Sequence, residues 1–323
     1  MIFKRFYSVF NPALYHGWGK SRKFFEGWYY KIVSKNQKYA FAIIPGIAMD
    51  ENGKKQSFIQ LLDGKELNAK YYKFDFDKFT PSNYIHDVKI DNSRFTENFI
   101  EIDIPNFSGK LFFEKVITWP NSIFSPGIMG PFSFIPFMEC YHGILSMNHT
   151  VKGKITYNNK IIDFNQGKGY IEKDWGHSFP RGYIWMQCNN FADSSISIKA
   201  SIAKIPWLNS SFIGFIAGVS IGKKLFQFTT YNFSKIIKCN LENKKVELII
   251  ENSRYILIIY TLTNLSTELI APIRGYMDSR IEETMNGNIE FIIKEKKSNK
   301  IICQNKGTSA AIEIAGEYKV LLK

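Results

Sequence analysis

The stretch "KYAFAIIPGIAM" at residues 38–49, the turn "DENGKK" at 50–55 and the run "SFIQLLDG" at 57–64 decide the fold of this chain. Two apolar runs joined by a short polar turn that contains Asn and Gly indicate a β-hairpin. A second such hairpin combines "SSFIGFIAGVSI" at 210–221, the turn "GKK" and "LFQFTTYNF" at 225–233. Short strands at regular intervals, with almost no helical periodicity, predict an all-β protein.

The order of these elements repeats along the chain. An aromatic strand at 25–33 precedes the first hairpin, and another at 183–191 precedes the second. The repeat predicts two similar antiparallel β-barrel modules packed together, an N-terminal one over residues 1–165 and a C-terminal one over residues 166–323. A stretch at 118–143 holds four prolines and three glycines, which predicts a long ordered loop late in the first module.

Composition and charge restrict the class of partner. The 323 residues are 45% apolar and 16% aromatic, which is enough for a packed core and argues against disorder. The net charge of +13 fits an anionic partner, but the lysines are scattered over turns and no nucleic-acid motif is present. We therefore expect no nucleic-acid partner, and we keep peripheral contact with an anionic membrane as the alternative.

The cysteines and the first residues point to a compartment. The four cysteines form no CxxC pair and have no histidine at metal-ligand spacing, so we expect reduced thiols and no metal site. The opening "MIFKRFYSVF" is too short and too charged for a signal peptide, and polar residues and glycines interrupt the apolar window at 205–222. We expect a cytoplasmic protein without a signal peptide, transit peptide or transmembrane helix. The oligomeric state stays open.

The stretch "FFEGWYYKIV" at 24–33 combines a carboxylate with aromatic residues on a strand. Alternation places Glu26, Trp28 and Tyr30 on one face, and Tyr29 and Lys31 on the other. Within an aromatic box, desolvation would raise the pKa of a carboxyl and favour the protonated acid. The alternative is that Glu26 pairs with a lysine at the mouth of the barrel.

The stretch "GYIEKDWGHSFPRGYIWMQCNNF" at 169–191 is denser. Alternation places Tyr170, Glu172 and Asp174 on one face and Trp175 on the other. Asp174 ends its strand before a turn, where a side chain can reach a pocket mouth, and we prefer it as the general acid. Glu172 beside it would help the pair to retain one proton. The alternative is that Asp174 caps the following turn.

Two further groups of polar residues lie on predicted strands. Trp185, Gln187 and Asn189 share one face, which suits a polar-lined pocket for a hydroxylated ligand. The alternative is that these are buried amides bonded to neighbouring backbone. In "ECYHGILSMNHT", alternation puts His142 and Ser146 on one face. The alternative for that histidine is an ordinary hydrogen-bonded side chain.

Several of these motifs together resemble the tocopherol cyclase family, over residues 12–316: "KFFEGWYYKIV", "SFIQLLDG", "MECYHGILSMNH", "GYIEKDWGHSFP" and "APIRGYMDSRIEETMNG". The resemblance implies lipocalin-like barrels, related to those of carotenoid hydratases. It also implies cyclisation of a prenylated hydroquinone to a chromanol without a cofactor or a redox change. In that reaction an acid protonates the prenyl alkene and the phenol oxygen captures the cation, which aromatic faces stabilise.

The motifs predict a set of site residues, and we expect neither a metal nor a cofactor. The predicted catalytic residues are Asp174, Glu172, Glu26 and His142. The predicted substrate-binding residues are Trp28, Tyr30, Gln60, Trp175, Trp185, Gln187 and Asn189. We expect Trp28, Tyr30, His142, Trp185, Gln187 and Asn189 to line one pocket with at least one of the carboxylates. The partner is a hydrophobic prenyl quinol-like molecule. The alternatives are a non-catalytic carrier of such a ligand, or a hydratase in which water captures the cation.

Overall fold

The computed structural model describes residues 7–263 and 266–323, so the first six residues of the opening stretch lie outside it. Antiparallel strands make up most of the described chain, and the all-β prediction is confirmed. No helix in the described ranges combines the length and apolarity needed to cross a bilayer.

The chain divides into two compact units. The first contains the residues up to Phe179 together with Leu269–Arg280, and the second contains Pro180–Glu268 and Ile281–Lys323. Each unit has one large sheet and its own apolar core. The domain boundary expected between residues 165 and 166 stays a prediction.

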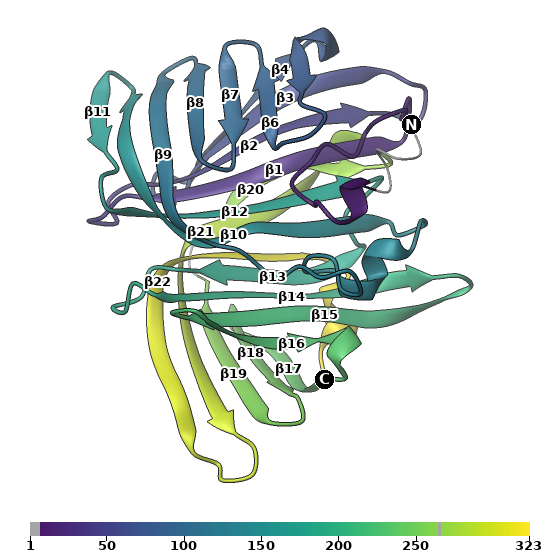
Figure 1. Cartoon of the computed structure of the whole chain (residues 1–323), viewed down its shortest axis with the longest axis vertical. Coiled ribbons are helices and arrows are strands. Elements are labelled where there is room, and N and C mark those ends of the chain that lie inside the picture. The colour runs from purple at the N-terminus through teal and green to yellow at the C-terminus, as the bar shows by residue number, and fades with distance from the viewer. Residues whose placement is uncertain (1–6, 264–265) are drawn as a thin grey trace. The chain divides into compact units, whose positions relative to one another are not determined.

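The first sheet has twelve strands within the described residues, in the order β4-β3-β2-β1-β12-β10-β9-β8-β7-β6-β5, with β11 paired to β10 (Figure 1). The predicted hairpin at 38–64 is confirmed as β2 and β3. The strands are β1 Phe24–Val33, β2 Ala40–Met49, β3 Lys55–Asp63, β4 Asn68–Phe74, β5 Phe79–Pro81, β6 Asp87–Ile90, β7 Ser93–Thr96, β8 Phe99–Ile104, β9 Phe107–Ile117, β10 Cys140–Tyr157, β11 Lys160–Asp163 and β12 Gly167–Gly176.

The second sheet has ten strands in the described ranges, in the order β16-β15-β14-β13-β22-β21-β19-β18-β17, with β20 paired to β21. The predicted hairpin at 210–233 is confirmed as β15 and β16. The strands are β13 Gly182–Cys188, β14 Ile196–Trp207, β15 Ser210–Ile221, β16 Lys224–Thr229, β17 Lys235–Glu242, β18 Lys245–Glu251, β19 Tyr255–Leu262, β20 Thr267–Ile273, β21 Tyr276–Glu295 and β22 Ile301–Gly316.

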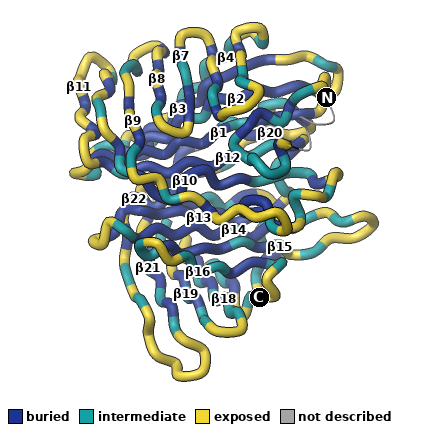
Figure 2. Tube along the Cα trace, viewed as in Figure 1, coloured by how far each residue is buried: buried dark blue, intermediate teal, exposed yellow. Residues whose placement is uncertain are grey.

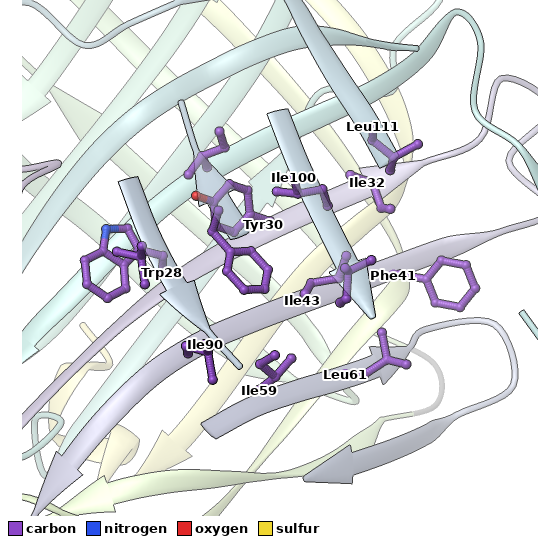
Figure 3. Packing of buried hydrophobic residues seen from close by; sticks show 14 of the residues in the cluster. Trp28, Tyr30, Ile32, Phe41, Ile43, Ile59, Leu61, Ile90, Ile100 and Leu111 are labelled. Carbon is purple, nitrogen blue, oxygen red and sulfur yellow. The ribbon is translucent and has the colours of Figure 1, made fainter. Parts of the chain in front are cut away.

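One face of the first sheet carries the core of the first unit, and we call it the inner face. Trp28, Tyr30 and Ile32 project from β1 onto this face, where Ile43 of β2 and Ile100 of β8 belong to the same apolar cluster (Figure 3). The strand centres are buried and the turns are exposed (Figure 2). The opposite side of the same sheet is the outer face.

The loop between β9 and β10 is ordered, as the prolines and glycines predicted. It contains no strand between Ile117 and Cys140, and its one regular element is the short 3-10 helix η2 at Gly130–Phe134. The other short 3-10 helices are η1 Phe76–Lys78, η3 Thr230–Asn232 and η4 Tyr318–Leu321.

Candidate functional site

Strand β12 lies between β1 and β10, and this pairing builds the candidate site. Asp174 is directly opposite His142 on β10 and Gly27 on β1, while Glu172 is opposite Tyr29. Residues opposite each other in an antiparallel pair project to the same face. Because Trp28 and its neighbours face the core, the alternate residues on these strands project to the outer face.

Four polar side chains form a cluster on that face, which we call the outer cluster: His142, Asp174, Glu172 and Tyr170. Nδ1 of His142 lies 2.7 Å from Oδ1 of Asp174, and Nε2 lies 3.5 Å from Oε2 of Glu172. The Tyr170 hydroxyl donates a short hydrogen bond to Oε2 of Glu172. The side chains of Asp174 and His142 are 24% and 14% exposed, so this cluster combines burial with access.

Two neutral hydrogen-bond donors, the Tyr170 hydroxyl of the outer cluster and the neighbouring Cys140 thiol, stay protonated in their surroundings. Burial, followed by the charge of Glu172, raises the pKa of Tyr170 well above its usual value. Burial and the nearby Asp174 likewise raise the pKa of the Cys140 thiol. Tyr170 is therefore a fixed hydrogen-bond donor to Glu172.

The outer cluster also has the donor set of a cation site. One ligand atom each from His142, Glu172 and Asp174 lies within 4.8 Å of the others, and nitrogen and carboxylate ligands suit several divalent metals. The same spacing also lets the imidazole of His142 contact both carboxylates directly.

Glu26 belongs to a different cluster, on the inner face. Its Oε1 lies 2.5 Å from Nζ of Lys173, and both side chains are fully buried. Its carboxylate also accepts hydrogen bonds from the backbone N–H of His16. Burial would raise the pKa of Glu26, but the charge of Lys173 and the bond with His16 hold that pKa below its usual value. The expectation of a protonated Glu26 acid is therefore wrong, and pairing with a lysine is what the structure has.

The aromatic box expected around Glu26 exists, but it holds the lysine. Nζ of Lys173 lies 4.8 Å from the ring centroids of both Trp28 and Trp175. The residues of the N-terminal segment close the box: Lys173 donates to the backbone oxygens of Pro12 and Leu14, and Trp28 Nε1 donates to Ala13 at 3.1 Å. Burial lowers the pKa of Lys173 to about 8 despite its partner Glu26. This box is a closed structural element.

Tyr30 also takes part in the core of the first unit. Its hydroxyl donates to the backbone oxygen of Thr96 at 3.2 Å and lies 3.0 Å from Nε2 of His86. Burial, with a smaller effect from the charge of Lys173, lowers the pKa of His86 to about 3. The substrate-binding role expected for Tyr30 is replaced by a buried polar contact.

Gln60 was expected to bind substrate, and the structure gives it a different task. Its Oε1 accepts from the backbone N–H of Ile270 at 2.9 Å, and its Nε2 donates to the backbone oxygen of the same residue at 3.3 Å. Both ends of the carboxamide are thus bonded to the two backbone groups of one residue, Ile270. Gln60 fastens the segment Leu269–Arg280 to the rest of the first unit.

The remaining predicted residues lie in the second unit. Trp185 and Gln187 project from β13 on the face opposite the core of that unit, which contains Ile184 and Met186. Asn189 is buried just beyond the strand. Sequence reasoning missed the charged side chains on the same face, namely Lys199, Glu283 and Glu313. The Tyr183 hydroxyl donates to Oε2 of Glu313 at 2.9 Å, and Glu283 is opposite Glu313 on the next strand.

The structure therefore separates residues that were expected to share one pocket. Trp28 and Tyr30 face the core, whereas His142 faces the opposite side of the same sheet. Ser146 does not accompany His142, because a register shift between Ile144 and Ser146 brings Ser146 opposite a core residue. The alternation of β12 itself was read correctly. The pairing of β12 with β1 and β10 determines which residues of the three strands lie on the same face. No local sequence pattern encodes that pairing.

Comparison with known sequences places the chain in a family context. The family model of tocopherol cyclase-like proteins matches residues 109–316. The chloroplastic tocopherol cyclase of Zea mays is 25% identical over 198 residues, which are 56% of this chain and 40% of that protein. A probable chloroplastic tocopherol cyclase of Oryza sativa subsp. japonica is 32% identical over 68 residues, 21% of this chain and 14% of that protein. The chain thus spans less than half the length of these relatives.

Solved structures share the fold. The crystal structure of CghA has a TM-score of 0.58 at 9% identity, covering 91% of this chain and 89% of that one. A Nitrosomonas europaea protein assigned as AttH has a TM-score of 0.52 at 15% identity, covering 90% and 92%. The matched family region contains the strands that carry His142, Glu172 and Asp174. Since it also covers more than half of the residues, the chain belongs to the tocopherol cyclase-like family.

Proposed function

We propose that this protein is an isomerase that cyclises a prenylated hydroquinone to a chromanol by proton transfer, without a redox change. The observation that carries the proposal is the contact of 2.7 Å between His142 and Asp174, with Glu172 on the other side of the imidazole. Family membership and the tocopherol cyclase of Zea mays support the substrate class. We also propose that the protein is cytoplasmic and that its ligand is one hydrophobic small molecule.

In this proposal, the proton donor is the hydrogen-bonded pair of His142 and Asp174 rather than an isolated Asp174. A carboxylate that accepts from Nδ1 fixes the orientation of the ring and leaves Nε2 to deliver or receive a proton. Glu172 lies near Nε2 and is itself held by the Tyr170 hydroxyl. The three side chains thus lie within reach of one another for proton transfer.

The proposed reaction balances without any co-reactant. The pair gives a proton to the less substituted carbon of the prenyl alkene, and a tertiary cation forms. The phenol oxygen bonds to that cation, and the phenol proton returns to the His142–Asp174 pair, which restores the starting state. Holding the phenol beside the cation supplies much of the rate by proximity. Tyr29 and Tyr170, two tyrosines of the outer face, are the aromatic groups that stabilise the cation in this proposal.

The test is turnover of a short-chain prenyl hydroquinone by the purified protein, followed by chromatography and mass spectrometry. Asp174→Asn keeps the shape and removes the acid, and Glu114→Gln is the matched control because Glu114 pairs with Lys152 at the surface. We expect a chromanol of unchanged mass from the unmodified protein and the control, and strongly reduced turnover from Asp174→Asn. Equal turnover by Asp174→Asn would exclude it as part of the donor.

The two other functions give different outcomes in the same assay. A product that has gained the mass of water would identify a hydratase. Ligand binding without turnover by the unmodified protein would identify a carrier.

A further inference from the structure

The loop between β9 and β10 exposes several large apolar side chains. No charged residue occurs from residue 117 to residue 138, and we call this stretch the apolar loop. Phe124 is 86% exposed, Ile123 73%, Phe137 53% and Phe134 45%. Exposed apolar residues that stand alone are common, but four in one uncharged loop mark an interaction surface.

The apolar loop is built on an ordered base, so its exposed residues are presented by the fold. The backbone N–H of Gly127 donates to the side chain of Asn121 at 3.2 Å, and Asn121 donates to the backbone oxygen of Phe10 at 2.6 Å. Ser133 donates to the backbone oxygen of Pro126 at 3.0 Å. Other members of the loop are buried, namely Trp119, Ile128, Met129 and Met138. An ordered loop loses little conformational entropy when it binds.

We propose that the apolar loop is the site at which this protein docks on an anionic bilayer, with Phe124 and Phe137 entering the boundary between headgroups and acyl chains. The net charge of +13 attracts the chain to an anionic surface. The loop itself has no charge to desolvate, and it offers no ionic group to pair with a protein partner. Aromatic and aliphatic side chains are the groups that enter such a boundary.

This inference rests on the proposed function in one respect. A prenyl hydroquinone dissolves in the bilayer, so a protein that converts it gains from contact with that surface. The docking itself is a property of the loop and the net charge. It can therefore be measured without any turnover.

The experiment is sedimentation of the full-length protein with vesicles of phosphatidylcholine, with and without added phosphatidylglycerol. The double variant Phe124→Ser, Phe137→Ser should bind the anionic vesicles at least about tenfold more weakly, because each phenyl ring loses its burial in the bilayer. Ile161→Ser, on β11, is the matched control with 72% exposure, and it should bind as the unmodified protein does. Phe124→Trp keeps an aromatic ring and should retain binding.

Several results would overturn the inference. One is that the unmodified protein stays in the supernatant with both vesicle types. Another is that the double variant sediments as the unmodified protein does, with an unchanged thermal transition. A third is that the unmodified protein does not bind vesicles but self-associates in analytical ultracentrifugation, and that the double variant abolishes this self-association. That result would assign the loop to contact with a second copy of the chain. Turnover of a short-chain substrate in detergent, measured in parallel, tests the proposed function separately.

Discussion

His142 and Asp174 are directly opposite each other on neighbouring strands, and Nδ1 of the imidazole lies 2.7 Å from Oδ1 of the carboxylate. The backbone pairing of β10 and β12 fixes this contact, so the pair does not depend on the conformation of a loop. Sites held by paired strands keep their geometry better than sites on mobile segments.

If the two residues act as one proton donor, their variants will not be additive. We expect His142→Gln and Asp174→Asn each to lower kcat by about a hundredfold to ten-thousandfold, the usual range for a general acid. The double variant should lose little more than the worse single variant. The measurement is kcat for all three proteins. Losses that multiply in the double variant would mean that the residues act independently.

The ion pair between Lys173 and Glu26 should be a large local contribution to stability. Lys173→Met leaves a buried carboxylate without its cation, and we expect a loss of about 3–5 kcal/mol in the free energy of unfolding. The double variant Glu26→Leu, Lys173→Met should be less destabilised than the sum of the single variants. Lys152→Met is the control, since its surface pair with Glu114 should contribute at most about 1 kcal/mol. Denaturant titration distinguishes these cases, and equal losses for both lysines would contradict the prediction.

Two buried histidines should make the protein less stable in acid. Burial, with a nearby lysine as the smaller cause, lowers the pKa of His86 and that of His149 to about 3. Between pH 6.5 and 3 the unfolded chain binds these protons and the folded chain does not. Stability should therefore fall as the pH falls through this window, by at most about 1.4 kcal/mol per pH unit for each histidine. His86→Phe should reduce the slope, whatever its effect at pH 7, and an unchanged slope would count against a neutral His86.

Gln60 offers a direct test of a structural role against a binding role. Gln60→Leu leaves both backbone groups of Ile270 without their side-chain partners, and we expect a loss of about 1–3 kcal/mol. Hydrogen exchange at the amide of Ile270 should become faster. The KM of the folded variant should match that of the unmodified protein. A raised KM with unchanged exchange would restore the substrate-binding role.

Gly27 lies opposite Asp174 on β1, so a side chain added there would occupy space beside the outer cluster. A Cβ at this position would lie 3.6 Å from Cγ2 of Ile44, an ordinary van der Waals contact. We therefore expect Gly27→Ala to change stability by less than about 1 kcal/mol. It should raise the KM for a prenyl hydroquinone by narrowing this space. An unchanged KM would mean that the substrate does not approach Gly27.

Local patterns were sufficient for the two hairpins and for the faces of β12, but not for the face of Ser146 beyond the register shift in β10. Alternation placed Glu172 and Asp174 together and Trp175 on the other side, as the register of β12 confirms. The pairing of β12 with β1 joins residues some 140 positions apart in the sequence, and no local propensity reports such contacts. For the same reason His16 was missed as a partner of Glu26. The backbone N–H of His16 donates to the carboxylate of Glu26. His16 lies in a segment whose sequence has no strand periodicity.

The three consecutive residues Glu172, Lys173 and Asp174 send two anions to the outer face and one cation into the core. The alternation of these side chains therefore serves both the proposed proton transfer on the outer face and the ion pair in the core. Inserting or deleting one residue in β12 before Glu172 would exchange the faces. The lysine would enter the outer cluster, and two carboxylates would enter an apolar interior. This strand should consequently tolerate almost no change in its length.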